Sequence, residues 1–293
     1  MDGIIIINKE KGCTSHDIVH KAKKIFNEKV GHTGTLDPNA TGVLPLLIGK
    51  GTLLSKYLIE HDKIYEAVLK LGQKRDTADE EGKIIEEKMV NTSKISKLNV
   101  EEVLKKFIGI QEQIPPIYSA IKVNGKKLYD YARKNESVEI KPRKIEIYSI
   151  ELININLEQK EICFKVHCSK GTYIRTLCED IAQSLNTVGY MKELKRCKVG
   201  NFLLENAVLI NELEENINNK DFFNKYFISI EENFKERPYK KIEKNEEVIK
   251  FLNGVSMKTD LPEGVIRIYD KNNKFIGTGY IKNNILKRDI III

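Results

Sequence analysis

The stretch "GHTGTLDPNATGVLP", Gly31 to Pro45, contains one carboxylate, Asp37, among glycines, threonines and prolines. Pro38 fixes its own φ, while the glycines of the stretch allow another backbone segment to approach closely. Such a loop can present a single acidic side chain to a ligand. An aspartate before a proline is also a common turn former that bonds nearby backbone N–H groups, and for the loop taken alone we favour that structural interpretation. Evidence from other parts of the sequence is needed to choose between a loop that presents Asp37 to a ligand and a structural turn.

Strand and helix patterns alternate on both sides of this loop. The run Ile4–Ile7 predicts a buried strand, and "TSHDIVHKAKKIF" predicts a helix that begins with Thr14 and Asp17 at the spacing of a capping box. After the loop, "YEAVLKLG" alternates as a strand does. Further along we expect a helix in "NVEEVLKKFIG", strands in "RKIEIYSIELININL" and "EICFKVHCS", and a helix in "GTYIRTLCEDIAQSL". These patterns predict an α/β or α+β body.

The domain organisation follows from shifts in composition. Residues 75–99 are polar, which predicts a surface excursion from the body. A charged segment around residues 231–247 separates the body from a short β-rich tail, in which "DKNNK" has turn composition between two strands. We therefore expect a catalytic or binding domain over residues 1–232 and a small β module over residues 233–293.

The length, composition, net charge and cysteine count of the chain narrow the class of protein. The 293 residues are 41% apolar and 31% charged, with a net charge of +7 and a pI of about 8.9. This balance favours a polyanionic partner, although a modest excess of lysine is also ordinary solvated surface. Five cysteines without a C-x-x-C pair argue against a disulfide framework or a zinc site. No apolar run approaches the ~20 residues that span a bilayer, so we expect a soluble, cytoplasmic protein that does not bind membranes.

Three further segments contain residues capable of chemistry. Tyr65 begins a predicted strand, and "CSKGTYIRTL" places Tyr173 and Arg175 where a strand passes into a helix. The segment 111–134 interleaves tyrosines with basic residues. Each feature alone is explained by core tyrosines or solvated cations. Together they describe a basic, aromatic-rich surface around an arginine and a lone carboxylate, which indicates RNA binding.

At these residues the sequence resembles the bacterial tRNA pseudouridine synthase B family, which acts on uridine 55 in the T-loop of tRNA. The resemblance rests on six collinear motifs: "NKEKGCTSHDIV", "GHTGTLDPNATGVLP", "YEAVLKLG", "QIPPIYSAIKVNGKKLYDYAR", "CSKGTYIRTL" and "LKRCKVGNF". It implies an α+β fold, with a mixed, largely antiparallel sheet surrounded by helices and a small C-terminal β module similar to a PUA domain.

The resemblance also implies a mechanism. Asp37 would be the nucleophile that helps to break the N1–C1′ bond of the uridine before the base is turned over and rejoined through C5. Arg175 would be its ion-pair partner. Tyr65 would stack on the base and is the candidate for removing the C5 proton. The reaction involves no redox change, so neither a cofactor nor a metal is implied.

The family's RNA contacts map onto further residues. His32 would hold the flipped nucleotides, Tyr173 and Leu194 would line the uridine pocket, and Lys9 matches a motif lysine near the site. The T-arm backbone would be gripped by the segment 122–144, in particular by Lys122, Lys126, Lys127 and Arg133. The C-terminal module would lie along the acceptor side of the tRNA, and we expect a monomer with no obligate protein partner.

Several residues depart from the family pattern. Glu10 stands in place of a common proline, Arg75 in place of the usual threonine, and Gly51 and Leu53 in place of a frequent alanine and lysine. None of them is Asp37, Tyr65 or Arg175, so we expect activity to survive. Two alternatives remain: a tRNA-binding protein that assists folding of the T- and D-arms, and a paralogue that acts on another RNA, such as ribosomal RNA in a guide-RNA particle.

Overall fold

A large mixed sheet forms the centre of the protein. The computed structural model describes residues 1–134 and 136–293, and within them this sheet has ten strands in the order β14-β1-β3-β12-β4-β11-β10-β7, with β2 beside β3 and β13 beside β12. In chain order the strands are β1 (Gly3–Lys9), β2 (Val30–His32), β3 (Thr41–Ile48), β4 (Lys63–Leu71), β7 (Gly109–Gln113), β10 (Arg143–Asn156), β11 (Glu161–Cys168), β12 (Gly189–Val199), β13 (Phe202–Leu203) and β14 (Phe227–Ser229). The pairing of β12 with β3 is parallel and the other pairings are antiparallel. The predicted fold class is confirmed.

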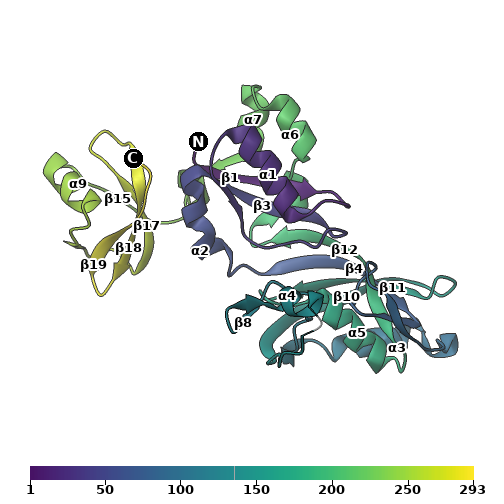
Figure 1. Ribbon diagram of the computed structural model, residues 1–293. Helices are drawn as coiled ribbons and strands as arrows, with labels where there is room; N and C mark the ends of the chain where they lie inside the picture. Colours follow the sequence, from purple (N-terminus) through teal and green to yellow (C-terminus); the bar gives the residue numbers. More distant parts are fainter. Residues whose placement is uncertain (135) are drawn as a thin grey trace.

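Strand β12 joins two halves of this sheet (Figure 1). On one side Lys195 and Arg196 lie opposite Thr41 and Gly42 of β3, and on the other side β12 runs antiparallel to β4. Gly42 has φ +103°, and a Cβ there would lie 2.2 Å from the carbonyl oxygen of Arg196. Only glycine fits at this crossing, as the close backbone approach expected of the loop requires.

Each half of the sheet is covered by its own helices. Helix α1 (Ser15–Phe26) covers the half that contains β1 and β3, and its predicted capping box, formed by Thr14 and Asp17, is confirmed. The other half is covered by α3 (Lys97–Lys105) and α5 (Ile174–Ser184). The remaining helices are α2 (Ser55–Leu58), α4 (Leu128–Arg133), α6 (Ile210–Asn216), α7 (Lys220–Tyr226), α8 (Ile230–Asn233) and α9 (Asn245–Leu252). Within the described residues, no helix is long and apolar enough to cross a membrane.

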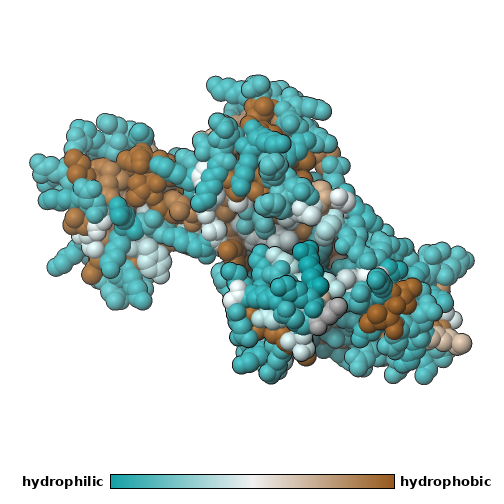
Figure 2. Space-filling model, in the orientation of Figure 1, coloured by the Kyte–Doolittle hydropathy of each residue, from teal (hydrophilic) through white to brown (hydrophobic). Residues whose placement is uncertain are grey.

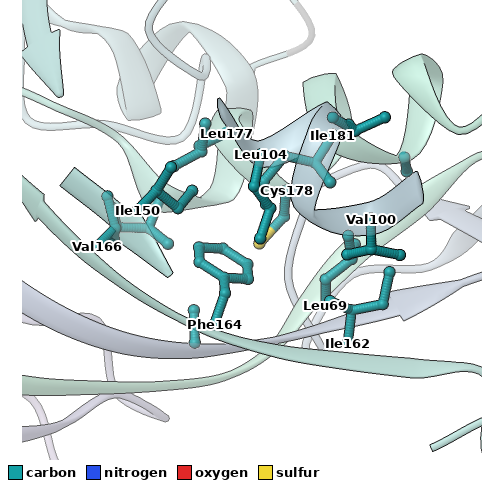
Figure 3. Close-up of a cluster of buried hydrophobic side chains, with 14 of the residues drawn as sticks. Leu69, Val100, Leu104, Ile150, Ile162, Phe164, Val166, Leu177, Cys178 and Ile181 are labelled. Carbon is teal, nitrogen blue, oxygen red and sulfur yellow. The ribbon is translucent and has the colours of Figure 1, made fainter. Parts of the chain in front are cut away.

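The core below α3 and α5 shows how the sequence pattern sets this packing. The alternating residues Ile162, Phe164, Val166 and Cys168 of β11 are all fully buried, as their spacing predicts. Figure 3 shows the ring of Phe164 between the strands and side chains of both helices, among them Leu104 and Cys178. This core fixes the start of α5, where Arg175 lies.

The polar segment 75–99 is only in part the surface excursion that its composition predicts. A hairpin of β5 (Gln73–Arg75) and β6 (Ile84–Glu87) does lie at the surface, where the side chains of β6 are exposed. The loop between these strands turns back to the body, however. Ala78 is buried, and Asp79 forms an isolated bridge with Met191 of β12. The prediction was wrong for this loop because composition does not reveal a long-range contact.

The C-terminal residues form a separate five-stranded sheet. Its order is β15-β17-β18-β19-β16, from β15 (Tyr239–Lys241), β16 (Met257–Lys258), β17 (Gly264–Tyr269), β18 (Phe275–Lys282) and β19 (Ile285–Ile291). The predicted turn between β17 and β18 is confirmed. Figure 2 shows apolar residues gathered over part of this module on an otherwise mostly hydrophilic face. The boundary between residues 232 and 233 stays a prediction.

Apolar and polar contacts fix this module against the body. Val265, Phe275 and Ile290 share a buried cluster with Ile4 and Leu47 of the large sheet. The hydroxyl of Tyr57 and the ammonium of Lys56 on α2 both reach the carboxylate of Asp289 on β19, and Tyr269 donates to Glu231, 2.7 Å away. The module is therefore docked on the body beside β1 and α2.

Candidate active site

Buried Lys9 holds the backbone of the loop that carries Asp37. Lys9 ends β1 and is fully buried, and its Nζ donates to the carbonyl oxygens of Glu10, Pro38 and Ala40 at 3.0, 2.9 and 2.6 Å. The prediction that Lys9 contacts RNA is therefore wrong, because its ammonium is enclosed by the protein's own carbonyls. Its position indicates that it fixes the turn directly after Asp37 to the end of β1.

Arg196 and Ser15 hold the same loop from two other directions. Arg196, on β12, is 2% exposed, and it donates from Nε to the carbonyl oxygen of Val43 at 2.7 Å and from Nη2 to that of Gly34 at 3.0 Å. The Ser15 hydroxyl donates to the carbonyl oxygen of Leu36 and accepts from its N–H. Side chains from three elements therefore determine where Asp37 points. Arg196 was missed at the sequence level, although the motif "LKRCKVGNF" contains it.

The ion pair expected between Asp37 and Arg175 is present. Arg175 lies in the first turn of α5, and its Nε is 3.2 Å from Oδ2 of Asp37, with Nη2 3.5 Å from Oδ1. The Arg175 side chain is 7% exposed, whereas that of Asp37 is 36% exposed. The guanidinium is thus enclosed, and one carboxylate that it contacts is open to solvent and to a ligand.

Arg175 also contacts a second carboxylate, that of Asp79, with its Nη1 3.4 Å from Oδ2. Nη1 donates to the carbonyl oxygen of Thr77 at 3.2 Å, and Nη2 donates to that of Tyr118 at 2.9 Å. The guanidinium is therefore fixed between two acids and two carbonyls. Sequence reasoning missed Asp79 because it lies in the polar segment assigned to the surface. The turn composition of "DTADEEG" directly after a strand was the available signal.

The environment of Asp37 disfavours its charged form. Burial raises the pKa of Asp37 above its usual value, and the charge of Arg175 opposes this shift without cancelling it. The neighbouring Asp79 raises the pKa further, while Lys9 and Arg196 lower it. Asp37 is therefore a partly exposed carboxylate whose charged form its surroundings disfavour, which is the situation of a reactive acid more often than of a surface turn former.

Tyr65 lies on β4, directly opposite Arg196 of β12 in the antiparallel register. Its side chain is almost completely buried, and burial raises the pKa of Tyr65 above its usual value of 10. The charge of Arg196 lowers this pKa in part. Tyr65 is thus a neutral phenol at neutral pH in the free protein, and its role as a base stays a prediction.

Five of the predicted residues lie together in the walls of one cleft. The cleft has a volume of about 680 Å³, which is within the range of pockets that hold small ligands, about 300–1,000 Å³. Its walls contain Asp37, Tyr65, Tyr173, Arg175 and Leu194. Tyr173 is fixed by Gln113, which accepts from its N–H at 2.8 Å and donates to its carbonyl at 3.0 Å. The roles proposed for these residues remain predictions, but their proximity is a property of the fold.

The charge of the cleft is strongly positive. Among the described residues that line it, the basic ones are Lys63, Arg143, Lys144, Lys170, Arg175 and Arg196, and the acidic one is Asp37. Burial, and then the charge of Arg196, lowers the pKa of Lys63 to about 8, so this lysine is still mainly protonated at pH 7. Except for Arg175, none of these basic residues was singled out for the cleft from the sequence. An anionic ligand is favoured here.

His32 directly precedes Thr33 and Gly34, which line this cleft. It is half-buried at the end of β2, and its Nδ1 accepts a hydrogen bond from the N–H of Gly34 at 3.3 Å. Burial lowers the pKa of His32, so the ring is neutral at pH 7. Among the described residues, His32 is not one of those that line the cleft. Its contact with flipped nucleotides stays a prediction.

A basic hairpin adjoins the cleft. Strands β8 (Lys122–Val123) and β9 (Lys126–Lys127) are joined by Asn124 and Gly125, both with positive φ, as a tight two-residue turn requires. Helix α4 follows directly and carries Tyr129, which lines the cleft.

Cations of this hairpin and of α4 lie against tyrosine rings. Lys127 and Arg133 are 5.1 and 5.3 Å from the ring centroid of Tyr129, and Lys126 is 4.3 Å from that of Tyr131. These three cations and Lys122 lie beside the cleft and are not among the described residues that form its walls. Within the segment 122–144, Asn135 lies outside the described residues. Cation–aromatic pairs of this kind present charge and stacking surface together.

The arrangement combines a carboxylate, a guanidinium and a phenol around one cavity. Within residues 1–134 and 136–293, no group of three or more His, Cys, Asp or Glu side chains is placed to hold a metal ion. The chemistry that the described side chains can perform is nucleophilic attack by Asp37 and proton transfer by polar groups nearby.

Family models match most of the chain. Residues 23–174 match the TruB family pseudouridylate synthase N-terminal domain, and residues 175–232 match the tRNA pseudouridylate synthase B C-terminal domain. Residues 244–287 match a further model, described as pseudouridine synthase II TruB, C-terminal.

Curated relatives are similar over almost the whole chain. A tRNA pseudouridine synthase B of Clostridium kluyveri is 46% identical over 291 residues, which is 97% of this chain and 96% of the relative. One of Caldanaerobacter subterraneus is 42% identical over 95% of each chain. A solved H/ACA RNP bound to a substrate RNA containing 2′-deoxyuridine includes a chain with a TM-score of 0.69 and 23% identity, covering 99% of this chain and 85% of that one. At this identity the likeness concerns the fold alone.

Proposed function

The chain belongs to the TruB family of pseudouridylate synthases, and on that premise we propose that it isomerises uridine 55 in the T-loop of tRNA, with Asp37 as the nucleophile. It is a tRNA pseudouridine synthase, an isomerase, as its relatives of 40–49% identity are. The position in the tRNA and the role of the aspartate are the parts that this proposal adds.

One observation carries the assignment of the nucleophile. Asp37 is the acidic residue among the described cleft walls, and its carboxylate is held 3.2 Å from the buried guanidinium of Arg175. A fixed cation aims the carboxylate and stabilises its charged form against the desolvation of the site. A turn former would need neither the buried arginine nor the cavity.

The proposed reaction is the one that the family resemblance implies. The N1–C1′ bond of the uridine breaks, the base rotates within the cleft, and C5 bonds to C1′ as N1 gains a proton and C5 loses one. Asp37 adds either to C1′ of the ribose or to C6 of the base, and both routes need the same ionised carboxylate. Tyr65 stacks on the base and lies on the wall from which a proton acceptor for C5 would act. Leu194 and Tyr173 restrict water around the detached base, which protects it from hydrolysis.

Binding of RNA is supported by the charge around the cleft. The target uridine lies inside a folded T-loop and has to be flipped out, at a cost of roughly a few kcal/mol. The basic cleft walls and the hairpin cations would offset that cost by binding phosphates of the T-arm. The docked C-terminal module would lie along the acceptor side. We infer a monomer that acts in the cytoplasm, where tRNA is found in the bacteria that supply the relatives.

Two other functions fit the observations less well. A protein that only folds tRNA would use the basic surface but would have no use for the Asp37–Arg175 pair. A paralogue acting on another RNA would share the fold of the H/ACA chains, yet this chain has only 23% identity to those and 46% to a tRNA enzyme. Both comparisons favour tRNA as the substrate.

The test is release of tritium from an unmodified tRNA transcript labelled at C5 of its uridines, followed by mapping of the modified position. We expect the wild type to release one tritium from uridine 55, and Asp37→Asn to release none while binding the same transcript. Asp2→Asn, which changes an acid remote from the cleft, is the matched control. Release by Asp37→Asn at the wild-type rate, or pseudouridine at another position, would contradict the proposal.

A further inference from the structure

The loop that carries Asp79 is held in an unfavourable shape. It spans residues 76–83 between β5 and β6 and brings the Thr77 carbonyl and the Asp79 carboxylate to the guanidinium of Arg175. Four of its eight residues are acidic: Asp76, Asp79, Glu80 and Glu81. Their like charges repel one another at short range. In addition, Ala78 has φ +60°, a conformation that residues other than glycine rarely adopt.

Arg75 lies across this loop and closes it. Its Nη1 donates to the carbonyl oxygens of Glu80 and Gly82, at 2.6 and 3.0 Å. One guanidinium nitrogen therefore ties two points on the far side of the loop to its first strand.

The Arg75 guanidinium also lies over the ring of Tyr190, with its central carbon 4.4 Å from the ring centroid. Tyr190 is 4% exposed on β12, next to Met191, whose N–H donates to the carbonyl of Ala78 at 3.0 Å. Arg75 thus connects the loop to the central strand of the sheet, at the point where that strand already binds the loop backbone. Since the loop in turn contacts Arg175, these contacts are continuous from Arg75 to Asp37.

We propose that Arg75 is a positioning residue of the reaction: it clamps the 76–83 loop to β12 and thereby keeps Asp79 and the Thr77 carbonyl on Arg175. This inference rests on the proposed function of the Asp37 site. Arg75 touches neither the cleft nor Asp37, and it acts through the loop. The Arg75 side chain reaches both carbonyls and the Tyr190 ring at once, which a side chain as short as that of threonine could not do.

The test is a double-mutant cycle on the rate constant of tritium release, measured in a single turnover with enzyme in excess. The variants are Arg75→Thr, Arg75→Lys, Asp79→Asn and the double variant Arg75→Thr/Asp79→Asn. Lys83→Thr is the control, because it removes one positive charge from the same loop at an exposed side chain. The Kd for the transcript and the melting temperature are measured for every variant.

We expect Arg75→Thr to lower the rate constant between about tenfold and a hundredfold, as a small misplacement of catalytic groups does, with the Kd unchanged. Lys83→Thr should match the wild type. Arg75→Lys should restore only part of the rate, because an ammonium cannot form the planar fork and stack of a guanidinium. Arg75→Thr should have a smaller effect in the Asp79→Asn background than in the wild type, since one of the two loop contacts through which Arg75 acts is already altered there.

A wild-type rate for Arg75→Thr would overturn the inference, and so would an effect that multiplies with that of Asp79→Asn. If Arg75→Thr does not fold, the cycle is run with Arg75→Lys, which keeps the charge and the apolar stem. A wild type that releases no tritium would refute the proposed function itself. An active wild type together with an Arg75→Thr variant of the same rate constant would refute the clamp alone.

Discussion

The ammonium nitrogen of Lys9 lies 2.6 Å from the carbonyl oxygen of Ala40, inside the protein and out of reach of any ligand. We expect Lys9→Met to reduce the free energy of unfolding by about 2 kcal/mol, because the carbonyls of Glu10, Pro38 and Ala40 would lose a charged donor. Urea unfolding measures this change. The control is Lys11→Met, an exposed lysine that should stay within about 0.5 kcal/mol of the wild type. Equal stability of the two variants would show that the loop does not depend on the Lys9 ammonium.

Asp37→Asn should be more stable than the wild type at pH 7. Burial raises the pKa of Asp37 in the folded protein, so the wild type loses stability as the pH rises from the ordinary value of 3.8 through the folded value. At pH 7 it carries this whole cost, which a neutral amide does not. We therefore expect a higher melting temperature for Asp37→Asn than for the wild type at pH 7. Below pH 3.8 the difference should vanish, because Asp37 is then protonated in both states. A gain that persists there would exclude titration as its cause.

The core below α5 should depend strongly on one ring. Phe164→Ala removes the fully buried side chain at the centre of the cluster in Figure 3, and we expect it to cost about 3–5 kcal/mol. Chemical denaturation followed by circular dichroism measures the loss. Lys165→Ala, on the exposed side of the same strand, is the control and should change stability by less than about 0.5 kcal/mol. A small effect of Phe164→Ala would mean that the core can refill the cavity.

Arg133 should act as a phosphate contact. Arg133→Ala is expected to weaken tRNA binding and to reduce the slope of log Kd against log salt by about 0.9, the value for one phosphate contact. Filter binding at several salt concentrations measures both quantities. Lys97→Ala, an 81% exposed lysine on α3, should leave the slope unchanged. A weaker affinity at an unchanged slope would indicate that Arg133 supports Tyr129 and does not bind phosphate.

The fold was predictable wherever a local pattern sufficed. The capping box of Thr14 and Asp17 and the alternation along β11 are signals within a few residues, and both are confirmed. Strand β12 was not predicted, although it is central. Its register shifts between Met191 and Glu193 and again between Arg196 and Lys198, and each shift interrupts the period of two on which strand prediction relies.

The site was predictable where the family resemblance named residues, and less so where tertiary structure decides. The Asp37–Arg175 pair was expected and is present. Asp79 was missed because a loop that returns to β12 has the same polar composition as one that does not. The burial of Lys9 was missed because most lysines are exposed, and nothing nearby in the sequence shows that three carbonyls surround it.

The central position of β12 also determines when an active molecule can exist. Its partners β3 and β4 leave the ribosome long before residues 189–199. Until β12 is synthesised, the edges of β3 and β4 that pair with it have no partner strand. Such late closure between distant segments is slow and exposes edges that can pair wrongly with other chains. The catalytic cavity can therefore form only after β12 has been synthesised. A polypeptide interrupted before Gly189 contains Asp37, Tyr65 and Arg175 but lacks the strand that joins the two halves of the sheet.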